Sequence, residues 1–159
     1  MLRILLAVIH LLALGIGFGA IYARARALHR AGDGPDALRR AFAADTWWGV
    51  AAFLWISTGL WRVLAGTEKA PGYYWTNHVF YAKMGLLVLI LALEVSPMLT
   101  LIRWRIASQR GTLPTPVDLM PAARRLARIS DVQLLLVIGI VVAAVMLARG
   151  YGMRVGPSP

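Results

Sequence analysis

The chain has no cysteine and few acidic residues. Its 159 residues include 7 Asp and Glu against 17 Lys and Arg, which gives a formal net charge of +10. The absence of cysteine excludes disulfides, thiolate metal sites and cysteine catalysis. The sequence also lacks an H-E-x-x-H zinc motif, a phosphate-binding glycine loop and a recognisable serine nucleophile with a histidine base. Hydrolase and kinase chemistry are therefore not expected.

Apolar residues dominate what is present. They make up 59% of the chain, and the mean hydropathy is +0.66. Four apolar stretches reach the length of about 20 residues that a helix needs to cross a bilayer, at residues 4–23, 46–64, 79–101 and 131–148. The segments between them are too short to fold alone. The sequence predicts an all-α integral membrane four-helix bundle that forms one domain over residues 1–159, with the first helix retained rather than cleaved as a signal peptide.

The basic residues lie between the predicted spans and indicate an orientation. Two of the three connections are rich in arginine: the first has Arg24, Arg26, Arg30, Arg39 and Arg40, and the third has Arg103, Arg105, Arg110, Arg124, Arg125 and Arg128. The positive-inside rule then predicts that both termini lie outside, in a multi-pass protein of the bacterial cytoplasmic (inner) membrane. The arginines are interpreted as topology signals and contacts for anionic lipid, without nucleic-acid binding.

Glycine and proline predict where the helices end. The break at Gly32-Asp33-Gly34, followed by Pro35, predicts a tight hairpin between the first two helices. Residues 108–121 contain three prolines and a glycine and are predicted to be a linker. Gly15 and Gly19 form a G-x-x-x-G face that favours close helix approach.

Four basic side chains are predicted to share the outer half of the membrane. His10 lies in the first helix, Arg62 ends the second, and His78 and Lys83 begin the third. One interpretation is a pocket for an anion or cofactor, because buried cations in a bilayer face a partner or ligand. The alternative is that Arg62 and Lys83 extend to lipid head groups and His78 lies in the interface. His10 either forms an interhelical hydrogen bond or ligates a metal such as haem iron.

Three acidic residues are predicted at the opposite level. Glu94 follows Lys83 on the same helix face, about 16 Å further along the axis, and Asp45 and Asp131 begin neighbouring spans. Arg24, Arg39, Arg103 and Arg128 are possible partners in a structural ion-pair network. The alternative is a proton path through Asp45, Lys83, Glu94 and Asp131.

Several motifs resemble those of a bacterial family of four-helix membrane proteins known only as a domain of unknown function. They are HLLALG from residue 10, STGLWRV at 57–63, GYYWTNHVFYAK at 72–83, RWR at 103–105 and ARGYG at 148–152. More distantly, the layout is similar to HemJ-type protoporphyrinogen oxidases and CopD-like membrane proteins. The HemJ resemblance implies haem b bound through helix histidines, and His10 matches the first-helix position, whereas His78 lies about one turn too early for the second.

Two hypotheses follow. The first is a redox membrane protein that holds haem or quinone between its helices, with His10 as ligand and Lys83 and Arg62 receiving propionates. The second is a non-enzymatic bundle, a transporter subunit or a structural partner that forms homo-oligomers, in which Lys83, Glu94 and Asp45 are paired internally. The first predicts a protein that binds a chromophore, and the second a colourless one.

Overall fold

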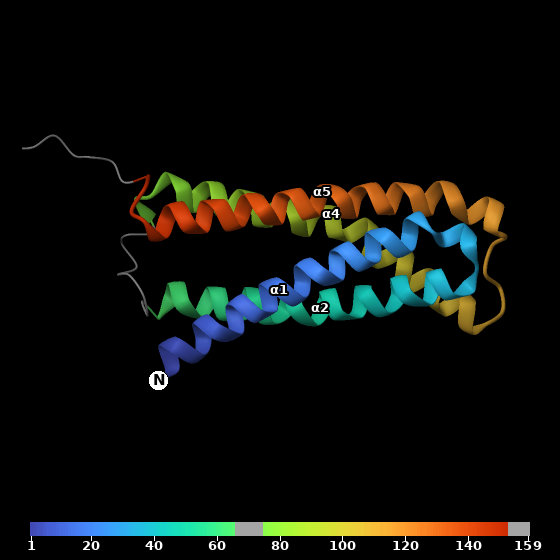
Figure 1. Ribbon diagram of the computed structural model, residues 1–159, viewed down its shortest axis with the longest axis horizontal. Helices are drawn as coiled ribbons and strands as arrows, with labels where there is room; N and C mark the ends of the chain where they lie inside the picture. Colours follow the sequence, from blue (N-terminus) through green and yellow to red (C-terminus); the bar gives the residue numbers. More distant parts are fainter. Residues whose placement is uncertain (66–74, 153–159) are drawn as a thin grey trace, which may run out of the picture.

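The computed structural model describes residues 1–65 and 75–152, which form four long helices (Figure 1). They are α1 (Leu2–His29), α2 (Pro35–Leu64), α4 (His78–Gln109) and α5 (Pro116–Ala148), with a short 3-10 turn, η1 (Ala31–Asp33), between α1 and α2. The prediction of an all-helical four-helix protein is confirmed. Every helix is longer than the predicted span within it, because the helices continue past the apolar stretches.

The first connection is the predicted tight hairpin. α1 ends at His29, and Gly34 has φ 129°, a conformation that glycine adopts without steric cost. Pro35 then begins α2 at the first helical position, where its missing N–H costs nothing.

The predicted linker over residues 108–121 is wrong. α4 continues to Gln109, and α5 already begins at Pro116, so the connection is much shorter. The Thr115 side chain accepts a hydrogen bond from the Asp118 backbone N–H and caps the helix. Pro116 starts the helix rather than breaking it, and α5 continues through Pro121.

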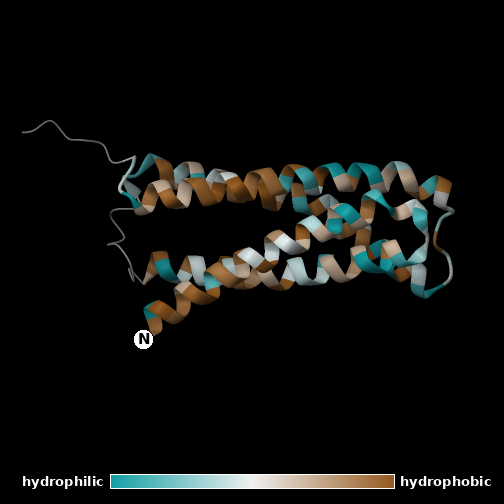
Figure 2. Ribbon diagram, in the orientation of Figure 1, coloured by the Kyte–Doolittle hydropathy of each residue, from teal (hydrophilic) through white to brown (hydrophobic). Residues whose placement is uncertain are grey.

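Three helices are long and apolar enough to cross a membrane, by length and composition: α1, α4 and the stretch Val117–Ala148 of α5. α2 is not among them, since charged and hydroxyl side chains interrupt its apolar run, namely Asp45, Thr46, Ser57, Thr58 and Arg62. Its membrane crossing stays a prediction. Large apolar side chains are exposed on all four helices, for example Ile4 (66%), Phe53 (71%), Val88 (65%) and Leu135 (69%). Figure 2 shows apolar residues along most of the helix lengths. This exposed apolar surface is what lipid contact requires; the orientation of the termini stays a prediction.

The helices pack as two hairpins that do not meet evenly. α1 packs mainly against α2 and α5, and α4 packs against α5, whereas α2 and α4 share little contact. The α1–α2 and α4–α5 pairs are separated at the end where the N-terminus lies (Figure 1). α1 approaches α2 closely at Gly17, where a Cβ would lie 3.1 Å from the Trp48 ring. At the predicted pair Gly15 and Gly19 a Cβ would meet nothing within 4 Å.

Candidate functional site

A buried polar cluster joins the two hairpins. Arg24 of α1 is completely buried, and its five N–H groups make five hydrogen bonds. Both terminal nitrogens donate to the Glu94 carboxylate at 2.6 and 2.8 Å, and Nη1 also donates to Asp45 Oδ1 at 2.8 Å. Nε donates to Ser130 Oγ at 3.2 Å and Nη2 to Gln133 Oε1 at 2.8 Å. We call these five residues the Arg24 cluster; all four helices contribute to it.

The Arg24 cluster is satisfied on its acceptor side as well. Gln133 Nε2 donates to Glu94 Oε2 at 2.8 Å and to the Ile90 carbonyl at 3.2 Å. The Ile90 carbonyl and the Ser130 hydroxyl, which donates to the Leu126 carbonyl at 3.1 Å, extend the network to the backbone of α4 and α5. A bidentate arginine–carboxylate pair is both strong and directional. The cluster therefore fixes the relative positions of the helices at this level.

The cluster brings together two of the predicted acidic residues and leaves the third outside. Asp131 lies on the surface and pairs with His29 at 2.9 Å, each side chain being nearly half exposed. Arg24 does not lie in the first connection, because α1 continues to His29 and carries Arg24 into the bundle. There it pairs with Glu94, for which it was one of the four possible arginine partners. Lys83 does not belong to the cluster; it lies toward the other end of α4 and lines a cavity there.

His10 is held against α2 at the opposite end of the bundle. Its Nδ1 lies 3.0 Å from Thr58 Oγ1, and the Thr58 hydroxyl is 2.6 Å from the Leu54 carbonyl. The hydroxyl donates its one proton to that carbonyl, so its oxygen accepts from His10 Nδ1–H. In the neutral imidazole the lone pair then lies on Nε2. Gly59 makes this packing possible, since a Cβ there would lie 3.0 Å from His10 Cε1.

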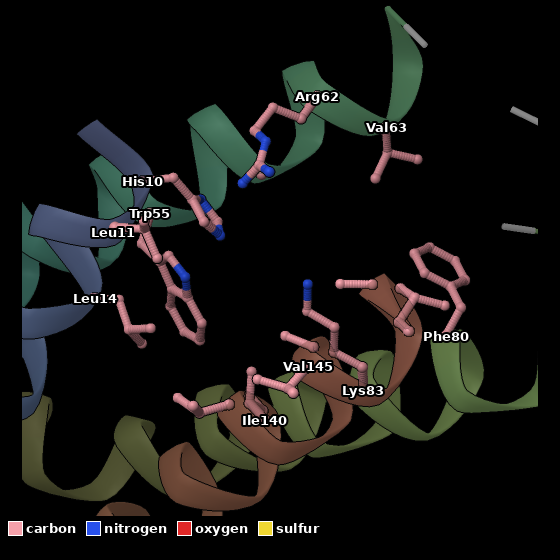
Figure 3. A pocket seen from close by; sticks show the side chains of 15 residues that line it. His10, Leu11, Leu14, Trp55, Arg62, Val63, Phe80, Lys83, Ile140 and Val145 are labelled. Carbon is pink, nitrogen blue, oxygen red and sulfur yellow. The ribbon is translucent and has the colours of Figure 1, made fainter. Parts of the chain in front are cut away.

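Four nitrogen-bearing side chains point into a cavity of about 290 Å³ beside His10 (Figure 3). They are His10 from α1, Trp55 and Arg62 from α2 and Lys83 from α4, and their nitrogens converge from both hairpins. Trp55 is buried, with 5% of its surface exposed. Within the described part of the chain its Nε1–H has no hydrogen-bond partner. A buried donor without a partner is costly, so this N–H is a position where a ligand acceptor would be stabilised.

The cavity, which we call the His10 cavity, continues into an apolar lobe. This second lobe has a volume of about 270 Å³. Seven residues line both it and the first lobe, the cavity of about 290 Å³: His10, Trp55, Gly59, Val63, Phe80, Lys83 and Ile140. Its other lining residues are Ile56, Leu60, Leu64, Trp75, Met84 and Leu87, from α2, α4 and the residues just before α4. Leu60, Leu64 and Trp75 are all more than half exposed, so the lobe reaches the outer surface between α2 and α4.

Of the four basic residues predicted to share the outer half of the membrane, three lie around one cavity. His10, Arg62 and Lys83 line the His10 cavity, whereas His78 is exposed at the first position of α4 and does not line it. In the described part of the chain, no group of three His, Asp or Glu residues is placed to hold a metal ion. A metal bound through His10 would therefore have to bring most of its other ligands with it, as haem iron does.

Sequence reasoning missed Thr58, Trp55, Ser130 and Gln133. The first two lie one turn or less from Gly59, and a glycine in a tryptophan-rich helix is a signal of close approach. The last two lie three residues apart on α5 and share a face, which is the spacing of a polar stripe in an apolar helix.

Comparison with known proteins gives a family. No curated protein and no solved structure matches the chain. The family described as "Predicted membrane protein (DUF2214)" matches residues 2–152, which cover both hairpins, the Arg24 cluster and the His10 cavity. The chain therefore belongs to this family of predicted membrane proteins.

Proposed function

We propose that the His10 cavity binds a quinone, and that the protein acts in the redox chemistry of the bacterial cytoplasmic membrane. The observation that carries the proposal is the buried Trp55 Nε1–H, which points into the cavity beside the nitrogens of His10, Arg62 and Lys83. A quinone ring has two carbonyl oxygens, which accept hydrogen bonds from donors such as the Trp55 indole N–H, the Arg62 guanidinium and the Lys83 ammonium. The redox role follows from the ligand, since the cofactor carries the electron chemistry and the protein binds and orients it.

The shape of the cavity favours a ligand with a polar head and an apolar tail. Arg62 lines only the first lobe, and His10, Trp55 and Lys83 lie where the two lobes meet. The rest of the second lobe is lined mainly by aliphatic and aromatic side chains. A volume of about 290 Å³ lies just below the range of about 300–1,000 Å³ for small-molecule sites. It suits a single ring, with an isoprenoid tail leaving through the apolar lobe between α2 and α4.

The test is binding of a short-chain ubiquinone to the detergent-purified protein, followed by isothermal titration calorimetry. Trp55→Phe keeps the ring and removes the N–H, so the quinone should bind about tenfold more weakly through loss of one hydrogen bond. Trp47→Phe is the matched control, because Trp47 lies on the same helix, is 60% exposed and does not line the cavity. Equal affinities for the two variants, or no binding by the native protein, would contradict the proposal.

Haem b is the second candidate, and the His10 tautomer favours it. The hydrogen bond to Thr58 leaves the lone pair on Nε2, which is the protonation state in which His10 would hold haem iron. Arg62 and Lys83 would receive the propionates. Haem would supply one-electron chemistry, and the chain's own residues would orient it.

The visible absorption spectrum distinguishes the two ligands. Haem predicts a stoichiometric Soret band in protein from haem-replete cells, and loss of that band in His10→Ala. A colourless protein that binds short-chain ubiquinone supports the quinone. A protein that binds neither supports the non-enzymatic bundle, in which these side chains serve packing alone.

A further inference from the structure

A second concave surface lies on the other side of the α1–α2 hairpin, away from the His10 cavity. It is a groove of about 520 Å³ between the second half of α1 and the first half of α2. Its floor consists of buried alanines, namely Ala20, Ala27, Ala37 and Ala44. Gly19, Ala23 and Ala43 continue it at the surface, and the exposed ring of Trp47 borders it.

Three arginines lie at one end of this groove. Arg26 and Arg30 are one turn apart at the end of α1, and Arg40 comes from the beginning of α2. All three side chains are exposed. The negative end of the α1 dipole stabilises Arg26 and Arg30, but Arg40 lies near the positive end of the α2 dipole. Three like charges around one groove repel each other, and an anion bound between them would remove that repulsion.

We propose that this groove binds an anionic phospholipid. The phosphate lies between Arg26, Arg30 and Arg40, and one acyl chain lies along the alanine and glycine floor. The arginines are at the end of an apolar helix, which is the level of the head groups, and tryptophan is common at that level. The charge of the arginines complements the lipid phosphate.

A second copy of the chain fits the groove less well than a lipid. Two subunits related by a twofold axis along the membrane normal would place the same surface against itself. The three arginines of one copy would then face the three arginines of the other. Charge complementarity therefore selects the phospholipid.

Native mass spectrometry of the full chain in detergent tests the site. The native protein should retain phosphatidylglycerol in preference to phosphatidylcholine with the same acyl chains. The triple variant Arg26→Gln/Arg30→Gln/Arg40→Gln should lower the affinity for phosphatidylglycerol about tenfold or more. The control Arg39→Gln/Arg103→Gln/Arg110→Gln removes as many exposed arginines elsewhere and should leave that affinity nearly unchanged.

Gly19→Leu tests the groove without changing charge. A Cβ at Gly19 meets nothing within 4 Å, so the variant should fold while its side chain fills the path of the acyl chain and weakens phosphatidylglycerol binding. Equal losses in the two triple variants, or unchanged lipid binding by Gly19→Leu, would overturn the proposal. If Gly19→Leu instead dissociates a dimer and leaves lipid binding unchanged, the groove is a self-association surface and the proposal is wrong.

Discussion

At the scale of the residue, Arg24 shows how an apolar bundle accommodates a full charge. A guanidinium has five N–H donors in a fixed plane, and the cluster supplies an acceptor for each one. Lysine has three donors and could not reach Ser130, Gln133 and two carboxylates together. The cluster therefore requires arginine at position 24 for the arrangement of its N–H donors as much as for its charge.

Arg24→Gln is expected to destabilise the protein by about 3–5 kcal/mol, since it leaves Glu94 and Asp45 buried without their cation. The free energy of unfolding in mixed micelles measures this. Adding Glu94→Gln to Arg24→Gln should recover part of the loss, because one buried charge is then removed. Arg128→Gln, at an exposed position on α5, is the control and should change stability by no more than about 0.5 kcal/mol. A cost for Arg24→Gln as small as that of the control would show that the cluster does not hold the bundle together.

At the scale of the element, the beginning of α4 is fastened to the chain that follows α5. Asn77 is completely buried and caps α4 by accepting hydrogen bonds from the Val79 and Phe80 backbone N–H groups, while its Nδ2 donates to the Tyr151 carbonyl. The His78 backbone N–H donates to the Gly152 carbonyl at 3.2 Å. One asparagine thus closes the α4–α5 hairpin at the end opposite its connecting loop.

Gly152→Ala is expected to damage this contact. Gly152 has φ 86°, and a Cβ there would lie 2.6 Å from both Asn77 Oδ1 and Val79 Cγ2. Gly150 has the similar φ of 85° with open space around it, so Gly150→Ala pays only the left-handed backbone cost of about 1–2 kcal/mol. Gly152→Ala should cost about 1 kcal/mol more, from the disturbed helix cap. Thermal unfolding, with hydrogen exchange of the Val79 and Phe80 amides, compares the two; equal stability would mean that the cap is not disturbed.

Sequence patterns predicted the positions of the helices well and the side-chain contacts between the helices poorly. Apolar length located all four helices, and Gly32-Asp33-Gly34-Pro35 located the first turn, because these signals are local. Proline misled over residues 108–121, since its effect depends on whether it is at the first helical position or further in. His78 looked equivalent to Lys83 by depth, and only the cap at Asn77 determines that its side chain lies outside the cavity. Arg24 was one of four possible partners for the acidic residues. To choose it required knowledge of which helices face it, and that information is not local.

At the scale of the whole molecule, the two hairpins are held differently at their two ends. The Arg24 cluster connects all four helices at one level, whereas α2 and α4 share little contact and enclose the His10 cavity toward the other end. The separation of the hairpins should therefore vary more at the cavity end than at the cluster end.

Spin-label distance measurements test this difference, and the absence of native cysteine makes introduced labels specific. Labels at Trp61 and Val142, both more than half exposed, report the cavity end; labels at Arg39 and Arg125 report the other end. The distance distribution should be broader for the first pair and should narrow when a short-chain ubiquinone binds. Two equally narrow distributions would contradict the expectation.

The division of the Arg24 cluster between the hairpins has a consequence for biogenesis. The first hairpin carries Arg24 and Asp45, whose opposite charges neutralise each other, while the second carries Glu94 with only Ser130 and Gln133 as neutral companions. Helices enter the bilayer before they pack together, and an uncompensated acid is unfavourable there. Arg24 and Asp45 can pair as soon as the first half of the chain is inserted, whereas Glu94 gains contact with a guanidinium only on docking. An undocked second hairpin is therefore a recognisable target for membrane quality control.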